Sequence, residues 1–273
     1  MTYPGTLKRA QPSKQTALRD QVQSLVRGLS VIRAFDGEAQ LTLSGVAQRT
    51  GLTRAAARRF LLTLVELGYI KADGRDFRLT PKTLNLGYSY LSSHSIPEVA
   101  LPHVEALVTH VEESSEMGML DGHDVVYVLR VAGPRILTAS ISIGARRPAH
   151  ATALGRVLLT GLTTEHLDEY LQTVQLKKIQ EATLIDRDKL RTELELVSRQ
   201  GYALVDQELE EGLRAVAAPI HDRTGRVIAA MTLSSHTSRR SMQDMETILL
   251  PQLLDTVREI EIDLRVSGVD LRT

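Results

Sequence analysis

The chain of 273 residues contains no cysteine. This absence excludes disulfides, thiolate zinc sites, iron–sulfur clusters and a cysteine nucleophile. Long apolar runs are also missing, since none approaches the roughly 18–20 residues that a membrane-spanning helix needs. Residues 1–15 lack the apolar core of a secretory signal. We therefore expect a cytoplasmic protein that does not contact a membrane.

Signatures of common enzymes are missing as well. The sequence has no glycine-rich dinucleotide fingerprint, no Walker loop and no G-x-S-x-G nucleophile elbow. Its eight histidines do not show the spacing of a helical metal site. Ser234, His236 and Asp206 are the three residue types of a catalytic triad, but their spacing in the sequence does not support a triad. We predict no catalytic residue, no metal and no cofactor.

Charge is distributed unevenly along a chain whose formal net charge is zero. Residues 1–80 carry 13 Lys and Arg against 6 Asp and Glu, whereas residues 81–273 carry 20 against 27. A basic segment joined to an acidic remainder suggests that the basic segment contacts nucleic acid. A solvated charged face would give the same counts.

The pattern of residues 20–80 predicts a winged helix-turn-helix domain, which follows a flexible arm at residues 1–19. Apolar residues recur at steps of three and four from Val22 to Phe35, as in an amphipathic helix. A brief helix from Gly45 to Arg49 is expected next, with Ser44 as its N-cap.

A turn and a second helix complete this motif. Gly51 suits a backbone with positive φ, and Thr53 is expected to cap a helix that ends near Leu67. Two short strands around the turn at residues 73–76 predict a hairpin, the wing. The residues expected at DNA are Ser44, Thr53, Arg54, Arg58, Arg59, Arg75 and Arg78.

A linker helix is predicted over residues 81–96, with Thr80 as its cap and Pro81 at its first position. Residues 97–268 then predict an effector-binding domain with a mostly antiparallel sheet flanked by helices. One of its strands is expected from Ile136 to Ile143, and one long helix from Ser241 to Leu264. The overall prediction is therefore an α+β protein of two domains.

Residues 144–156 form a basic loop that leads into a helix beginning at small residues. Free amide groups at a helix start, together with the helix dipole, favour binding of a carboxylate. Arg146 is expected to add a charge-assisted hydrogen bond. The alternative is a plain strand-to-helix turn. Glu208, Glu210 and Glu211 are expected in a solvated loop, or in a loop that gates a ligand site.

Several stretches resemble IclR-type bacterial transcription regulators. In the first domain these are Ser24–Ile32 and Leu67–Ile70, and in the second domain Ala151–Leu159 and Asp206–Ile220. The resemblance runs from about residue 22 to residue 262, with the motifs in the same order. The stretch Leu52–Leu64 is similar to the branch that regulates aromatic-acid breakdown through the β-ketoadipate pathway.

This resemblance implies promoter DNA as one partner and a small carboxylic acid as the effector, with protocatechuate, 4-hydroxybenzoate and β-ketoadipate as candidates. It also implies a homodimer or tetramer and, frequently, activation of the target genes; RNA polymerase is a further candidate contact. The effector residues that it implies are Ala153, Leu154, Asp206, Ala215, Thr232 and Ser234. Some relatives have cysteine where this chain has Ala215. The alternatives are an enzyme, or an architectural protein without a ligand, joined to a DNA-binding module.

Overall fold

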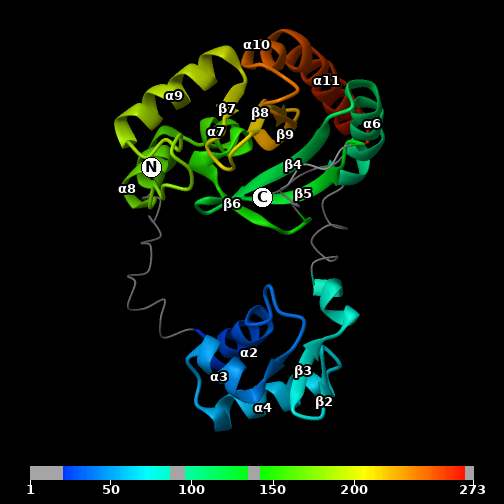
Figure 1. Ribbon diagram of the computed structural model, residues 1–273, viewed down its shortest axis with the longest axis vertical. Helices are drawn as coiled ribbons and strands as arrows, with labels where there is room; N and C mark the ends of the chain where they lie inside the picture. Colours follow the sequence, from blue (N-terminus) through cyan, green and yellow to red (C-terminus); the bar gives the residue numbers. More distant parts are fainter. Residues whose placement is uncertain (1–20, 87–95, 135–141, 268–273) are drawn as a thin grey trace, which may run out of the picture. The chain divides into compact units, whose positions relative to one another are not determined.

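The computed structural model describes residues 21–86, 96–134 and 142–267 (Figure 1). The chain divides into two compact units, residues 1–90 and residues 91–273. The expected arm at residues 1–19 lies outside the described residues. So do most of the strand expected over residues 136–143 and most of the linker helix expected over residues 81–96.

The first unit combines a helical core with a small antiparallel sheet, whose strand order is β1-β3-β2. Its elements are α2 (Gln23–Arg33), β1 (Leu41–Thr42), α3 (Leu43–Thr50), α4 (Arg54–Glu66), β2 (Ile70–Asp73), β3 (Asp76–Leu79) and the 3₁₀ turn η1 (Pro81–Thr83).

Local chemistry explains the turn between α3 and α4. Gly51 ends α3 with φ 66°, a left-handed conformation in which glycine is not strained. Thr53 caps α4 by accepting a hydrogen bond from the Ala56 amide at 3.2 Å. Ala57 is completely buried, so α4 packs closely against its neighbours. The predicted helix-turn-helix and the hairpin of β2 and β3 are confirmed.

Two predicted caps of this unit are wrong. Helix α3 begins at Leu43 and not at Gly45, because Thr42 accepts the capping hydrogen bond from the Gly45 amide. Ser44 therefore lies within the first turn and is exposed. The Thr80 hydroxyl does not cap the next helix, since it donates to the Gly68 carbonyl at 2.6 Å.

The second unit contains a six-stranded sheet with the order β6-β5-β4-β9-β8-β7, and every paired neighbour is antiparallel. Its strands are β4 (Ser114–Asp121), β5 (Asp124–Val131), β6 (Arg146–Pro148), β7 (Ala203–Asp206), β8 (Leu213–His221) and β9 (Val227–His236). Its helices are α6 (Ile96–Val111), η2 (Ala149–Ala151), α7 (Ala153–Thr160), α8 (Thr164–Thr173), α9 (Arg187–Gln200), α10 (Met242–Asp244), η3 (Met245–Leu249) and α11 (Leu250–Val266). This arrangement confirms the predicted α+β class.

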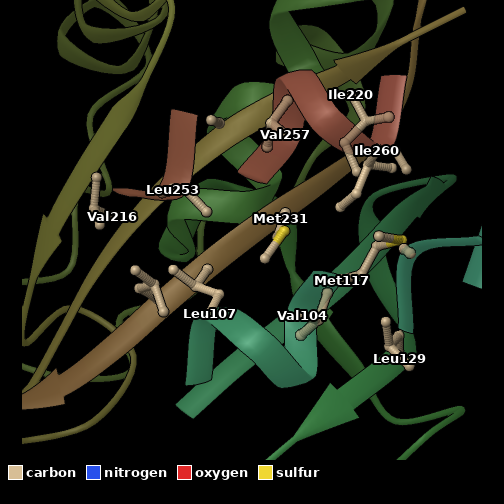
Figure 2. Close-up of a cluster of buried hydrophobic side chains, with 14 of the residues drawn as sticks. Val104, Leu107, Met117, Leu129, Val216, Ile220, Met231, Leu253, Val257 and Ile260 are labelled. Carbon is tan, nitrogen blue, oxygen red and sulfur yellow. The ribbon is translucent and has the colours of Figure 1, made fainter. Parts of the chain in front are cut away.

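Helices cover both faces of the sheet. Side chains that alternate along the strands, such as Met117 and Met231, pack on one face against α6 and α11 (Figure 2). The opposite face, which includes Ala217 and Ala230, packs against α7 and α9. Alternate residues of β8 and β9 therefore face different apolar clusters, whereas the register shift between β4 and β5 places both Val128 and Leu129 in the cluster beside α6 and α11.

Two further predictions are corrected in this unit. Arg146–Pro148 is not a loop but the edge strand β6, which pairs with β5. The expected helix from Ser241 to Leu264 is interrupted by the π-helical turn η3. Pro251 is the second residue of α11, which begins directly after this turn, and a proline in a continuous α-helix would lose a backbone hydrogen bond and clash with the preceding turn. No helix within the described residues has the length and apolarity to cross a membrane.

Candidate functional site

The helix α4 presents a row of exposed cations directly after the turn. Arg54, Arg58 and Arg59 are all exposed, and Arg54 and Arg58 are spaced to share one helix face. None of these guanidinium groups forms an ion pair with any described residue. Thr53 precedes them as the N-cap. A helix that follows a helix-turn and carries exposed arginines near its start fits the major groove of DNA.

The hairpin adds two more exposed arginines. Arg75 follows Gly74 at the turn between β2 and β3, where Gly74 has φ 61°. Arg78 lies on β3 with its guanidinium 3.9 Å from the Asp73 carboxylate, and both side chains are largely exposed. Such a surface pair contributes little to stability and leaves the charge available to a phosphate. The DNA contacts expected of these residues, and of Ser44, stay predictions.

The second unit contains a small, partly open cavity of about 30 Å³ at the start of α7. A volume of that size holds one or two water molecules. Residues from β4, β5, β7, β8, β9 and the start of α7 surround it. Its lining consists of Glu116, Tyr127, Ala151, Thr152, Ala153, Leu154, Val205, Leu209, Leu213, Ala215, Thr232 and Ser234.

Five of the seven expected effector residues line this cavity, namely Ala153, Leu154, Ala215, Thr232 and Ser234. The three strand residues share the sheet face that meets α7, because Ala215 pairs with Ser234 and the odd-numbered residues of β9 occupy the other face. Thr152 caps α7 by accepting from the Gly155 amide at 3.0 Å. The structure thus brings together residues that are 80 positions apart in sequence.

Two expected effector residues do not line the cavity. Arg146 lies on the edge strand β6, half exposed, and its guanidinium is held by Asp121 at 2.6 Å and Asp124 at 3.2 Å. Asp206 forms an ion pair with Arg214 at 2.9 Å. Both charges are therefore engaged by residues of other strands, and the effector contacts expected of Arg146 and Asp206 stay predictions.

Glu116 and Tyr127 were not expected in the cavity. Glu116 is 3% exposed, and it accepts a hydrogen bond from the Ser234 hydroxyl at 3.1 Å. Burial raises the pKa of Glu116 from 4.5 to about 7, although the hydrogen bond from Ser234 and the charge of Arg130 act in the opposite direction. Burial and the nearby Glu116 charge raise the pKa of the Tyr127 phenol, so it stays protonated. The available sequence signal was an acidic residue among the buried residues at the start of β4.

A buried ion pair secures one wall of the cavity. Arg156, on α7, is 2% exposed, and its guanidinium lies 2.6 Å from the Glu208 carboxylate. Glu208 also accepts a hydrogen bond from the Leu184 amide at 2.8 Å. The next residue, Leu209, lines the cavity. Of the two expectations for Glu208, a solvated loop is wrong, because Glu208 is buried and connects α7 to the loop beside the cavity; a gating role of that loop stays a prediction.

The three residues considered above as a catalytic triad form their hydrogen bonds and ion pairs with other residues. The Ser234 hydroxyl donates to Glu116, Asp206 pairs with Arg214, and the His236 Nδ1 atom lies 2.8 Å from the Ser238 hydroxyl. No hydrogen bond among the described residues joins Ser234, His236 and Asp206. Among the described residues, these three side chains are therefore not linked to one another.

Comparison with known families and relatives agrees with this organisation. Residues 24–74 match the IclR helix-turn-helix domain, and residues 88–262 match the bacterial transcriptional regulator IclR C-terminal domain. The Pca regulon regulatory protein of Pseudomonas putida is 40% identical over 92% of this chain and 88% of its own length. The p-hydroxybenzoate hydroxylase transcriptional activator of Acinetobacter baylyi is 35% identical over 91% of this chain and 94% of its own length.

Solved structures show the same fold. A crystal structure of a proposed transcriptional regulator from Rhodococcus sp. RHA1 has a TM-score of 0.81 and 51% identity, over 90% of this chain and all of that one. The inducer-binding domain of a PobR double mutant from Acinetobacter, in complex with 3-hydroxybenzoic acid, has a TM-score of 0.57 and 32% identity. That match covers 60% of this chain and 97% of the domain.

Proposed function

The chain belongs to the IclR family of bacterial transcriptional regulators, in the branch that controls aromatic catabolism, and from this premise we propose a specific division of labour. The second unit binds a small aromatic carboxylate in the cavity at the start of α7. The first unit contacts promoter DNA through α4 and the hairpin. Occupation of the cavity then changes transcription of genes for aromatic-acid breakdown.

The observation that carries this proposal is the composition of the cavity. Its apolar walls include Leu154, Val205 and Leu213, and its polar groups lie at the start of α7 and at Glu116 with Ser234. Apolar walls with a few placed polar groups are typical of sites for small organic ligands. The first-turn amides of α7 and its dipole favour a carboxylate.

The cavity must enlarge to hold such a ligand. About 30 Å³ is far below the roughly 150 Å³ of a cavity that binds benzene. Leu209 belongs to the loop that connects β7 and β8, so this loop supplies part of the lining. We propose that this loop moves when the effector binds. A ligand that changes the position of a loop has the differential affinity for two conformations that regulation requires.

The DNA contacts proposed for the first unit are those of the exposed arginines and Thr53. Arg54 and Arg58 enter the major groove, and Arg59, Arg75 and Arg78 contact the backbone or the groove edge. We propose a homodimer, or a pair of dimers, in the cytoplasm. The exposed apolar stripe of α2, formed by Val22, Leu25, Val26 and Leu29, supports self-association.

Thermal unfolding of the full chain with 4-hydroxybenzoate, protocatechuate and β-ketoadipate tests the effector. A ligand that binds the folded state stabilises it by about 2.7 kcal/mol at a concentration of about 100 Kd, and the melting temperature rises. The variant Ala215→Val, which places extra methyl groups in the cavity, should reduce that rise while remaining folded. Unchanged melting with all three acids would contradict the proposed aromatic-acid effector. An architectural protein without a ligand, joined to this DNA-binding domain, would show no such response.

A further inference from the structure

The binding of a carboxylate ligand does not explain why the cavity contains the acidic side chain of Glu116. Among the described residues that line the cavity, Glu116 carries the only carboxylate. It lies on β4 opposite Thr232 of β9, and it shares the sheet face that meets α7. A buried carboxylate in the site of an acidic ligand would repel the ligand's own carboxylate. Its presence therefore calls for a further role.

The hydrogen bonds of Glu116 leave it able to accept another donor. The Ser234 hydroxyl donates to Oε2 at 3.1 Å, and the Arg130 Nε atom lies 3.8 Å from Oε1, which is beyond hydrogen-bonding distance. An ionised carboxylate has about four lone-pair sites. Glu116 therefore has unused acceptor capacity at the wall of the cavity.

The polar groups of the cavity come from two sources, the start of a helix and the strands of the sheet. The start of α7, at Ala153 and Leu154, favours negative charge. Glu116 and Ser234 belong to different elements, the strands β4 and β9. A ligand that bears a carboxylate at one end and a hydroxyl at the other satisfies both groups, because its carboxylate avoids Glu116 and its hydroxyl can donate to it.

We propose that Glu116 is the specificity-determining residue that selects a hydroxylated aromatic acid over the acid without a hydroxyl group. The ligand hydroxyl donates a hydrogen bond to the Glu116 carboxylate while the ligand carboxylate lies at the start of α7. This inference rests on the proposed function of the cavity, and it names the group of the ligand that the cavity recognises.

The selectivity follows from the cost of an unsatisfied buried group. Benzoate fills the same space but offers Glu116 no donor, so the carboxylate loses water without gaining a partner. A hydrogen bond to a charged group changes affinity by roughly 10- to 150-fold. Sites built to bind a ligand hydroxyl reject the analogue without it far more strongly than apolar pockets reject a missing methylene.

Calorimetric titration of the full-length protein with benzoate, 3-hydroxybenzoate and 4-hydroxybenzoate, at a pH of about 8 where Glu116 with its pKa of about 7 is mostly ionised, tests this proposal. We expect the wild-type protein to bind at least one hydroxybenzoate roughly 10- to 150-fold more tightly than benzoate. Glu116→Gln keeps the shape but removes the charge, and we expect the preference to shrink by about tenfold or more while affinity for benzoate is unchanged or increased. Glu116→Met provides the same test if the glutamine variant does not fold.

Thr232→Val is the matched control within the cavity. The Thr232 hydroxyl already donates to the Val216 carbonyl at 2.8 Å, so its loss should alter affinity for all three acids alike. A preference that survives in Glu116→Gln overturns the role of Glu116, as does a wild-type protein that binds benzoate as tightly as the hydroxybenzoates. A wild-type protein that binds none of the three overturns the proposed hydroxybenzoate-type effector, and the inference with it.

Discussion

At the scale of single residues, Glu116 shows what burial does to a carboxyl group. Its side chain is almost completely removed from water, and desolvation raises its pKa to about 7 despite the hydrogen bond from Ser234 and the opposite charge of Arg130. Tyr127, on the neighbouring strand β5, faces the same charge and remains protonated. At neutral pH, Glu116 is therefore close to its titration midpoint.

This raised pKa predicts a specific pH dependence of stability. The folded value of about 7 exceeds the unfolded value of 4.5, so the folded state binds the proton more tightly. The resulting stabilisation is fully present below pH 4.5 and is lost as the pH rises through about 7. Its full size is about 3 kcal/mol, at about 1.4 kcal/mol for each pKa unit.

Glu116→Gln removes this titration. We expect its free energy of unfolding, relative to that of the wild-type protein, to rise by about 3 kcal/mol between pH about 4.5 and pH about 8. Denaturant unfolding followed by circular dichroism measures the difference. Glu210→Gln, in the loop between β7 and β8, is the control and should follow the wild-type curve. If the free energies of unfolding of Glu116→Gln and the wild-type protein changed in parallel with pH, Glu116 would have the same pKa in the folded and unfolded states.

The residues that were predictable from sequence are those whose role is local. Gly51 and Thr53 act on backbone groups within a few positions, so their residue types reveal the role. Arg146 and Glu208 act through partners far away in sequence. Nothing in the local pattern shows that Arg146 meets Asp121, or that Glu208 lies buried beside Arg156.

At the scale of elements, α7 depends on a close approach to the 3₁₀ turn that precedes it. Gly155 lies in the first turn of α7, and a Cβ atom placed there would overlap the backbone of Ala149. Backbone atoms cannot move aside as the end of a flexible side chain can. The glycine therefore allows α7 to begin at the position that forms the cavity.

Gly155→Ala should consequently destabilise the second unit, although alanine is the better helix former. Overpacking costs about 1–3 kcal/mol or more, which exceeds the gain of about 1 kcal/mol in helix propensity. Gly28→Ala is the matched control, because a Cβ atom on Gly28 of α2 would have only Phe60 nearby, at 4.0 Å. Thermal unfolding should show a lower melting temperature for Gly155→Ala and no loss for Gly28→Ala. An unchanged melting temperature for Gly155→Ala would refute the tight packing.

Helices and strands, like single residues, were predictable where their causes are local in sequence and were missed where they depend on distant partners. Periodicity and caps predicted most helices and hairpins, and Pro251 in the sequence marks the place where the C-terminal helix changes its hydrogen-bond pattern. Strand β6 was missed because it is only three residues long and exists through its pairing with β5. Short edge strands carry little periodic signal of their own.

At the scale of the whole molecule, charge is divided between the two units. The excess of basic residues within residues 1–80 balances the acidic excess of the remainder. The exposed arginines of α4 thus belong to a basic unit, so that DNA is attracted to one part of the chain and repelled by the other. A net charge of zero conceals this division.

The final prediction concerns Arg58, which lies on the exposed face of α4. Arg58→Ala should weaken binding to DNA fragments that the wild-type protein selects from a random pool, by roughly 5- to 140-fold if Arg58 contacts a base. Contact with a phosphate would instead lower the slope of log affinity against log salt by about 1. Arg199→Ala removes an exposed charge from α9 in the acidic unit and should change neither quantity. If Arg58→Ala binds like the wild-type protein at every salt concentration, α4 does not contact DNA through this face, since removing a contacting cation always reduces either specificity or counterion release.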